Sequence, residues 1–188
     1  MFFATGGLIV PDPDTTATAI AIHRLPFPDP GGFSACFTGH QRPRPSMAPT
    51  DAKASCLYPN VQRALIEAAR RGFESAVMLG PENQVAEFAT ANLMIVKDGV
   101  VRTPVADGTF LAGITRSRVI KLLREDGVRV EEATLSKADV MSADEVFSCG
   151  NYAKVQPTRR IEDREWPIGP VTLRARDLYF EFARNTAR

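Results

Sequence analysis

The chain has 188 residues, and 44% of them are hydrophobic, so it can bury one substantial core. Lysine and arginine total 23 and aspartate and glutamate 22, which leaves a formal net charge of +1 and argues against nucleic acid as a partner. The apolar start over residues 2–10 lacks a basic flank and is shorter than a membrane span. We therefore expect a cytoplasmic protein without a signal peptide, membrane anchor or membrane partner.

The cysteine content argues against two further classes of protein. Cys36, Cys56 and Cys149 are odd in number and lack the spacing of a metal site, and His23 and His40 are the only histidines that could assist them. The sequence therefore predicts neither a disulfide framework nor a metal centre.

The first third of the chain changes character near residue 59. Residues 11 to about 50 are rich in proline, glycine, threonine and serine, with apolar runs at 19–22 and 33–37. This pattern predicts strands joined by an extended connector. From Pro59, apolar residues recur at helical spacing until Gly72, so one amphipathic helix is predicted there.

The middle of the chain predicts a strand followed by a hairpin. Residues 74–80 form an apolar run typical of a strand. The runs 92–97 and 100–103 flank Asp98-Gly99, which is the signature of a two-residue type I′ turn.

Helices and strands alternate in the remainder. We expect helices from residue 113 to a stop at Gly127, over 136–143 and over 170–183, and strands over 128–135 and 145–149. The mixture predicts an α/β fold, that is, a mixed α+β domain.

Lys53 differs from the other lysines in its neighbours. Only small residues flank it in Ala52-Lys53-Ala54-Ser55-Cys56, which leaves space for a cofactor, and Tyr58 follows five positions on. A lysine taken alone is most often an exposed surface residue. The segment 51–60, however, resembles the lysine segment of the class IV aminotransferases, which use pyridoxal 5'-phosphate (PLP).

Three later segments resemble the same family and follow in its order. Residues 85–93 match its glutamate five residues before Asn-Leu, and Leu111-Ala-Gly-Ile-Thr-Arg116 is close to its Leu-x-Gly-Ile-Thr-Arg signature. Residues 143–152 match its acidic pair, apolar strand and glycine-led turn. Four ordered segments are a much more specific signal than any one motif.

The resemblance implies roles for three residues around the cofactor ring. Lys53 would form the Schiff base with the cofactor aldehyde and shuttle the proton during the reaction. Glu87 would keep the pyridine nitrogen protonated, so that the ring acts as an electron sink; its ordinary alternative is an exposed carboxylate at a strand end. Tyr58 would reach the phenolic oxygen of the cofactor, and its alternative is an exposed or core tyrosine.

The resemblance also implies where the phosphate binds. Gly113-Ile114-Thr115 would offer backbone amides at the start of a helix, where the dipole favours an anion. The alternative is an ordinary helix cap. Asn151 would help to bind the phosphate, and Asn151 and Tyr152 would contact the substrate carboxylate in the turn after Gly150.

The implied fold is the large domain of the fold-type IV PLP enzymes, which is like that of D-amino acid aminotransferase. Residues 46–188 would form this PLP-binding domain, and residues 1–45 would be a remnant of the small domain with the interdomain linker. A reduced small domain would roof the site poorly and impair binding and turnover. Arg42, eleven positions before Lys53, would be structural, interdomain or close to the phosphate. Relatives build each site at a dimer interface, so a homodimer is expected.

Three functions stay open at this point. The first is amino-group transfer between a hydrophobic, branched-chain amino acid and 2-oxoglutarate. The second is a PLP lyase of the aminodeoxychorismate type, which would use the same lysine and cofactor. The third is a non-catalytic remnant that keeps the core of the domain.

Overall fold

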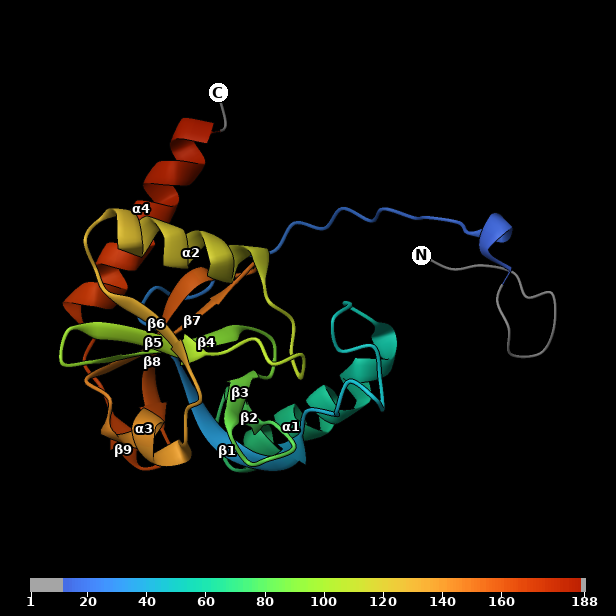
Figure 1. Ribbon diagram of the computed structural model, residues 1–188, viewed down its shortest axis with the longest axis horizontal. Helices are drawn as coiled ribbons and strands as arrows, with labels where there is room; N and C mark the ends of the chain where they lie inside the picture. Colours follow the sequence, from blue (N-terminus) through green and yellow to red (C-terminus); the bar gives the residue numbers. More distant parts are fainter. Residues whose placement is uncertain (1–11, 187–188) are drawn as a thin grey trace.

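The computed structural model describes residues 12–186, which form one curled sheet with helices packed against it (Figure 1). Eight strands follow one another in the order β3-β2-β1-β8-β7-β4-β5-β6, and β9 pairs with β8. The strands are β1 (Phe33–Gln41), β2 (Ser75–Leu79), β3 (Val85–Phe88), β4 (Asn92–Lys97), β5 (Val100–Pro104), β6 (Val130–Ala133), β7 (Glu145–Gly150), β8 (Lys154–Ile161) and β9 (Arg164–Glu165). The α-helices are α1 (Tyr58–Arg70), α2 (Ile114–Glu125), α3 (Lys137–Ser142) and α4 (Pro170–Thr186), with 3-10 turns η1 (Pro13–Thr15) and η2 (Ser55–Leu57).

Apolar clusters join the helices to the sheet. In Figure 1, α2 and α4 lie side by side, and Val119 and Leu123 of α2 belong to one cluster with Phe147 of β7. On the other part of the sheet, α1 packs against β1 and β2. Because α1 and α2 each bury one apolar face, their first turns are held at fixed places beside the strand ends.

The predicted hairpin is confirmed. β4 and β5 pair antiparallel, with Val96 opposite Val101, and the turn residues Asp98 and Gly99 have φ values of 51° and 73°. Positive φ at both turn residues is what a type I′ turn requires, and Asp-Gly adopts it with little strain.

The predicted helices are also confirmed, with small shifts at their ends. α1 begins one residue before Pro59, and α2 follows Gly113 directly. In α3, Ser136 accepts a hydrogen bond from the Asp139 amide, and the Asp139 carboxylate accepts one from the Ser136 amide. Within residues 12–186, no helix is long and apolar enough to cross a membrane.

The predicted strand over residues 19–22 is wrong. This segment is extended but unpaired, and it belongs to an arm over residues 16–30 that leaves the body of the domain (Figure 1). Ile20 and Ile22 are 87% and 93% exposed. An apolar run becomes a strand only where a neighbouring strand supplies hydrogen-bond partners, and the described residues place none beside it.

Three observed strands, β3, β8 and β9, were not predicted from the sequence. β8 contains Pro157 and several charged residues, which weaken the strand pattern, yet it lies between β1 and β7. The strand β1, which precedes residue 46, lies between β2 and β8. The sheet therefore begins at Phe33, and the division of the chain into two domains stays a proposal.

Candidate functional site

Five separate segments surround a cavity of about 320 Å³. They are the end of β1, the residues that lead into α1, β3 with the residues after it, the loop before α2 and the turn after β7. Its lining residues include five of the eight that the sequence predicted: Lys53, Tyr58, Glu87, Asn151 and Tyr152. Lys53 and Tyr152, which are 99 positions apart in the sequence, thus meet at one place.

Lys53 lies in an exposed turn, and its small neighbours Ala52 and Ala54 line the cavity with it. The segment is tethered because the buried Thr50 hydroxyl donates a hydrogen bond to the carbonyl oxygen of Gly108. Small side chains on both sides keep the space beside the Lys53 amine open. Tyr58, at the first position of α1, is 42% exposed and borders the same space.

Glu87 is a buried carboxylate at the back of the cavity, with 5% of the residue exposed. Arg42 forms an ion pair with its Oε1, and the side-chain amide of Asn92 donates to its Oε2 over 3.2 Å. Burial raises the pKa of Glu87 to about 7, while Arg42 and Lys53 lower it. The alternative of an exposed carboxylate at a strand end does not apply, because all four residues of β3 are buried although β3 lies at one edge of the sheet.

Asn92 connects the carboxylate to the loop before α2. Its Nδ2 also donates to the carbonyl oxygen of Leu111 over 3.0 Å. A Cβ atom on Gly113 would lie 2.4 Å from the Asn92 Oδ1, so this position has no room for a side chain. Asn92 had no role in the sequence-based prediction, although the motif of Glu87 five residues before Asn-Leu contains it.

The start of α2 lies next to the cavity but does not line it. Leu111 borders the cavity, whereas Gly113, Ile114 and Thr115 are absent from its lining. Gly113 is the N-cap and has no side chain to accept hydrogen bonds from the first amides of the helix, so no capping side chain competes with a ligand for these amides. Ile114 is 89% exposed and Thr115 is buried.

Arg116 is a second residue whose role could not be predicted from the sequence. Its guanidinium is buried and donates to the carbonyl oxygen of Pro104 over 2.8 Å and to Glu132 over 2.7 Å. These bonds fasten the first turn of α2 to β5 and β6. Long-range contacts of this kind are invisible in a local motif.

Asn151 and Tyr152 form the wall contributed by the turn after β7. The Asn151 side-chain oxygen accepts from Lys154 Nζ over 2.9 Å. The Tyr152 hydroxyl donates to the carbonyl oxygen of Pro26 over 3.2 Å and so ties the arm to the rim of the cavity. Tyr152 and Thr90 also border a second cavity of about 300 Å³, so the two spaces adjoin.

The site offers an amine, a buried carboxylate and hydrogen-bonding groups around one space, but no cluster of metal ligands. Among the described residues, no group of three or more histidine, cysteine, aspartate or glutamate side chains could hold a metal ion. Cys36 and Cys149 are buried and Cys56 is exposed, and all three are free thiols.

Comparisons with known proteins agree with this arrangement. Residues 3–161 match the family described as amino-transferase class IV. A branched-chain-amino-acid aminotransferase from Escherichia coli (strain K12) is 37% identical over 152 residues, which are 79% of this chain and 49% of that enzyme. One from Pseudomonas aeruginosa is 36% identical over 151 residues, covering 79% of this chain and 48% of that enzyme. The chain thus spans about half the length of these curated relatives.

Solved structures give the same result. The crystal structure of an aminotransferase from Brucella abortus bound to PLP superposes with a TM-score of 0.94 at 45% identity, over 97% of this chain and 65% of that one. A branched-chain aminotransferase from Thermoproteus uzoniensis with norvaline gives a TM-score of 0.80 at 33% identity, over 84% of this chain and 54% of that one. The fold is therefore the mixed α/β fold of these enzymes, and the chain belongs to the class IV aminotransferase family.

Proposed function

We propose that this chain binds PLP in the cavity and transfers an amino group between a hydrophobic, branched-chain amino acid and 2-oxoglutarate. The observation that carries the proposal is that the Lys53 amine and the buried Glu87 carboxylate, 34 positions apart in the sequence, border one cavity. Membership in the family and the PLP-bound relative support the same assignment.

The residues present fit the cofactor. A pyridine nitrogen needs an acceptor that stays inside a dry site, and Glu87 is buried and held by Arg42 and Asn92. An aldehyde needs an accessible amine, and Lys53 is exposed beside open space. When bound, PLP supplies an electron sink that stabilises negative charge at the substrate α-carbon.

Each predicted site residue would then have its own role in the reaction. Lys53 would bond the cofactor aldehyde and later take and return the proton at the substrate α-carbon. Glu87 would hold the proton on the ring nitrogen, and Tyr58 would hydrogen bond the phenolic oxygen. The amides of Ile114 and Thr115 would bind the phosphate from the start of α2.

The substrate side chain is proposed to be apolar because of the walls it would meet. The cavity includes Leu57, Val61 and Phe110, and the adjoining cavity includes Phe33 and Phe88. Asn151 and Tyr152, in the turn after β7, would contact the substrate carboxylate. A homodimer in the cytoplasm remains part of this proposal.

A single-turnover experiment tests this function. The PLP-loaded chain is mixed with L-leucine, and 4-methyl-2-oxopentanoate is measured by mass spectrometry, followed by addition of 2-oxoglutarate and measurement of L-glutamate. We expect both products in stoichiometric amounts from the native chain and neither from a Lys53→Ala variant. Lys97→Ala, which removes an exposed lysine paired with Asp144, is the matched control and should behave like the native chain.

The outcome separates the alternatives. Release of pyruvate from aminodeoxychorismate, without either product from leucine, would identify a lyase and overturn the transferase assignment. PLP bound without any turnover would identify a non-catalytic remnant.

A further inference from the structure

Arg42 has no role in the proposed chemistry, yet it forms the ion pair behind the cavity. We propose that Arg42 is a positioning residue that favours the ionised form of Glu87 and holds this side chain toward the cavity, and so sets how firmly the site holds a ligand with a protonated ring nitrogen. The ligand part rests on the proposed function, whereas the effect on Glu87 can be tested in the cofactor-free chain.

The contacts of Glu87 leave it little freedom to rotate. Arg42 Nη2 binds Oε1 and Asn92 Nδ2 binds Oε2, so each carboxylate oxygen has its own donor. The side chains of Arg42 and Glu87 are only 11% and 7% exposed. A carboxylate accepts up to about four hydrogen bonds, so both oxygens keep capacity for a donor on the cavity side.

Arg42 itself has few other partners. Its Nη2 lies 3.5 Å from the carbonyl oxygen of Ala89, and its Nε is buried without a hydrogen-bond partner among the described residues. Burying a guanidinium with an unsatisfied nitrogen costs free energy unless its charge is paired with an opposite charge. Within residues 12–186, the carboxylate that pairs with this charge is Glu87.

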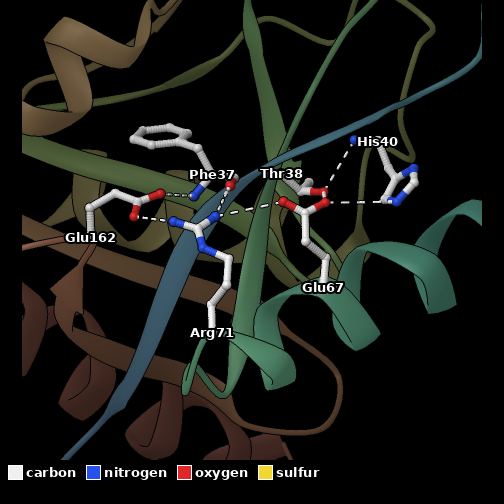
Figure 2. Close-up of polar contacts among 6 residues, drawn as sticks. All are labelled: Phe37, Thr38, His40, Glu67, Arg71 and Glu162. Carbon is white, nitrogen blue, oxygen red and sulfur yellow. Dashed lines mark hydrogen bonds and ion pairs between the residues drawn. The ribbon is translucent and has the colours of Figure 1, made fainter.

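Residues 37–40 of β1, a few positions before Arg42, are held by a network of polar contacts (Figure 2). Glu67 of α1 accepts from the Thr38 hydroxyl over 2.8 Å, and His40 Nε2 lies 3.7 Å from it. Arg71 donates to the carbonyl oxygen of Phe37 over 2.8 Å, and Glu162 accepts from the Phe37 amide over 2.8 Å. The last residues of β1 are thus held on both sides.

Arg42 follows β1 directly. Its amide donates to the carbonyl oxygen of Leu79 at the end of β2 over 2.8 Å. On the next strand, Glu87 pairs with Met78 of β2. The Arg42 side chain therefore crosses the end of β2 from a fixed backbone to reach Glu87.

The charges around Glu87 show what Arg42 contributes. Burial raises the pKa of Glu87, and the largest opposing effects come from Arg42, followed by Lys53. The Cys149 thiol of β7 also interacts electrostatically with Glu87, but burial raises the pKa of this thiol to about 12, so it stays neutral. Asn92 of β4 is neutral as well. Without Arg42, Lys53 would be the remaining cation that keeps Glu87 ionised.

The first test measures the ionisation of Glu87 without any cofactor. Glutamate is labelled with 13C at the side-chain carboxyl, the Glu87 signal is assigned with Glu87→Gln, and the pH titration is followed by NMR. Arg42→Met should raise the pKa of Glu87 by about one unit or more, since a neighbouring arginine typically lowers a carboxyl pKa by roughly 1–3 units.

Arg44→Met is the matched control for this test. Arg44 lies two positions on and pairs with Glu82, but its side chain is 50% exposed. The Arg44→Met substitution should leave the pKa of Glu87 unchanged. Arg42→Lys keeps the charge and should restore most of the native titration. If Arg42→Met does not fold, Arg42→Gln, which keeps a donor but not the charge, takes its place.

The second test measures affinity for PLP at pH 8 by titration. A folded Arg42→Met protein should bind PLP about ten-fold more weakly than the native chain, with Arg44→Met unaffected. An unshifted Glu87 titration in a folded Arg42 variant would overturn the inference. Failure of the native chain to bind PLP would instead overturn the proposed function, and the NMR result would stand apart from it.

Discussion

Glu87 couples the stability of the domain to pH. Burial raises its pKa in the folded state to about 7, above the ordinary value of 4.5. The folded protein therefore holds a proton that the unfolded chain releases between these values. The stabilisation from the protonated group is complete below pH 4.5 and is lost as the pH rises through 7.

This coupling predicts the behaviour of Glu87→Gln in the cofactor-free chain. Relative to the variant, the native chain should lose roughly 2–3 kcal/mol of unfolding free energy between pH 5 and pH 8. Urea denaturation at both pH values measures the difference. Glu82→Gln alters an exposed ion pair and is the control. Its unfolding free energy should change between pH 5 and pH 8 by the same amount as that of the native chain. Equal pH dependence of the native and Glu87→Gln proteins would show that Glu87 is not protonated in this range.

At the residue scale, the sequence pointed to five residues that line the cavity but not to the bonds that hold them. Lys53, Tyr58, Glu87, Asn151 and Tyr152 were identified by resemblance and meet at the cavity. The bonds from Arg42 and Asn92 to Glu87 could not be predicted in this way, because they depend on how strands distant in sequence are placed.

At the scale of elements, the start of α2 requires a glycine at position 113, because there is no room for a side chain there. Gly113→Ala would place a Cβ atom 2.4 Å from Asn92 Oδ1 and force Asn92 to move. We expect a loss of about 1–3 kcal/mol in unfolding free energy, as for other overpacked sites, together with weaker PLP binding. Chemical denaturation and a PLP titration measure the two effects.

Gly39→Ala is the control for that substitution, because nothing lies within 4 Å of a Cβ atom at Gly39. It should leave both stability and PLP affinity close to those of the native chain. If Gly113→Ala were as harmless as Gly39→Ala, the contact with Asn92 would not constrain the loop before α2.

The start of α4 depends on a carboxylate from another element. Glu145 of β7 is buried and accepts from the amides of Val171 and Thr172 over 3.1 and 2.7 Å and from the Thr172 hydroxyl over 2.7 Å. Glu145→Gln should cost about 2–3 kcal/mol of unfolding free energy, because charged hydrogen bonds are lost and an amide is placed against N–H donors. Thermal or urea unfolding measures this.

Glu181 lies exposed on the same helix, and Glu181→Gln should change stability little. A Glu145→Gln protein as stable as the Glu181→Gln protein would show that α4 does not need this cap.

The sequence predicted those helices and hairpins that are specified by residues close together in the chain. The Asp98-Gly99 turn and the α1 spacing were sufficient for the hairpin and the helix. β8 was missed because Pro157 and the charged residues weaken its strand pattern, and its place between β1 and β7 follows from the whole sheet. The run at 19–22 has the composition of a strand without a partner.

At the scale of the whole molecule, the arm and the body should differ in resistance to proteolysis. Arg24 is the first lysine or arginine of the chain and is exposed within the extended arm. Limited trypsin treatment should cleave after Arg24 before it cleaves any site in residues 33–186, because protease attack concentrates at exposed segments without packed structure. Mass spectrometry of the early fragments identifies the site.

The remaining body, residues 25–188, should keep its circular dichroism spectrum and cooperative unfolding. Early cleavage within α1 or α2, with Arg24 intact, would contradict the division into a packed body and an exposed arm.

The most direct test of the account is the covalent site of the cofactor. The purified chain is incubated with PLP, reduced with borohydride and digested, and the labelled peptide is sequenced by mass spectrometry. We predict that the label lies on Lys53, which borders the same cavity as the buried Glu87. A label on Lys97, Lys121, Lys137 or Lys154, or no label at all, would contradict it.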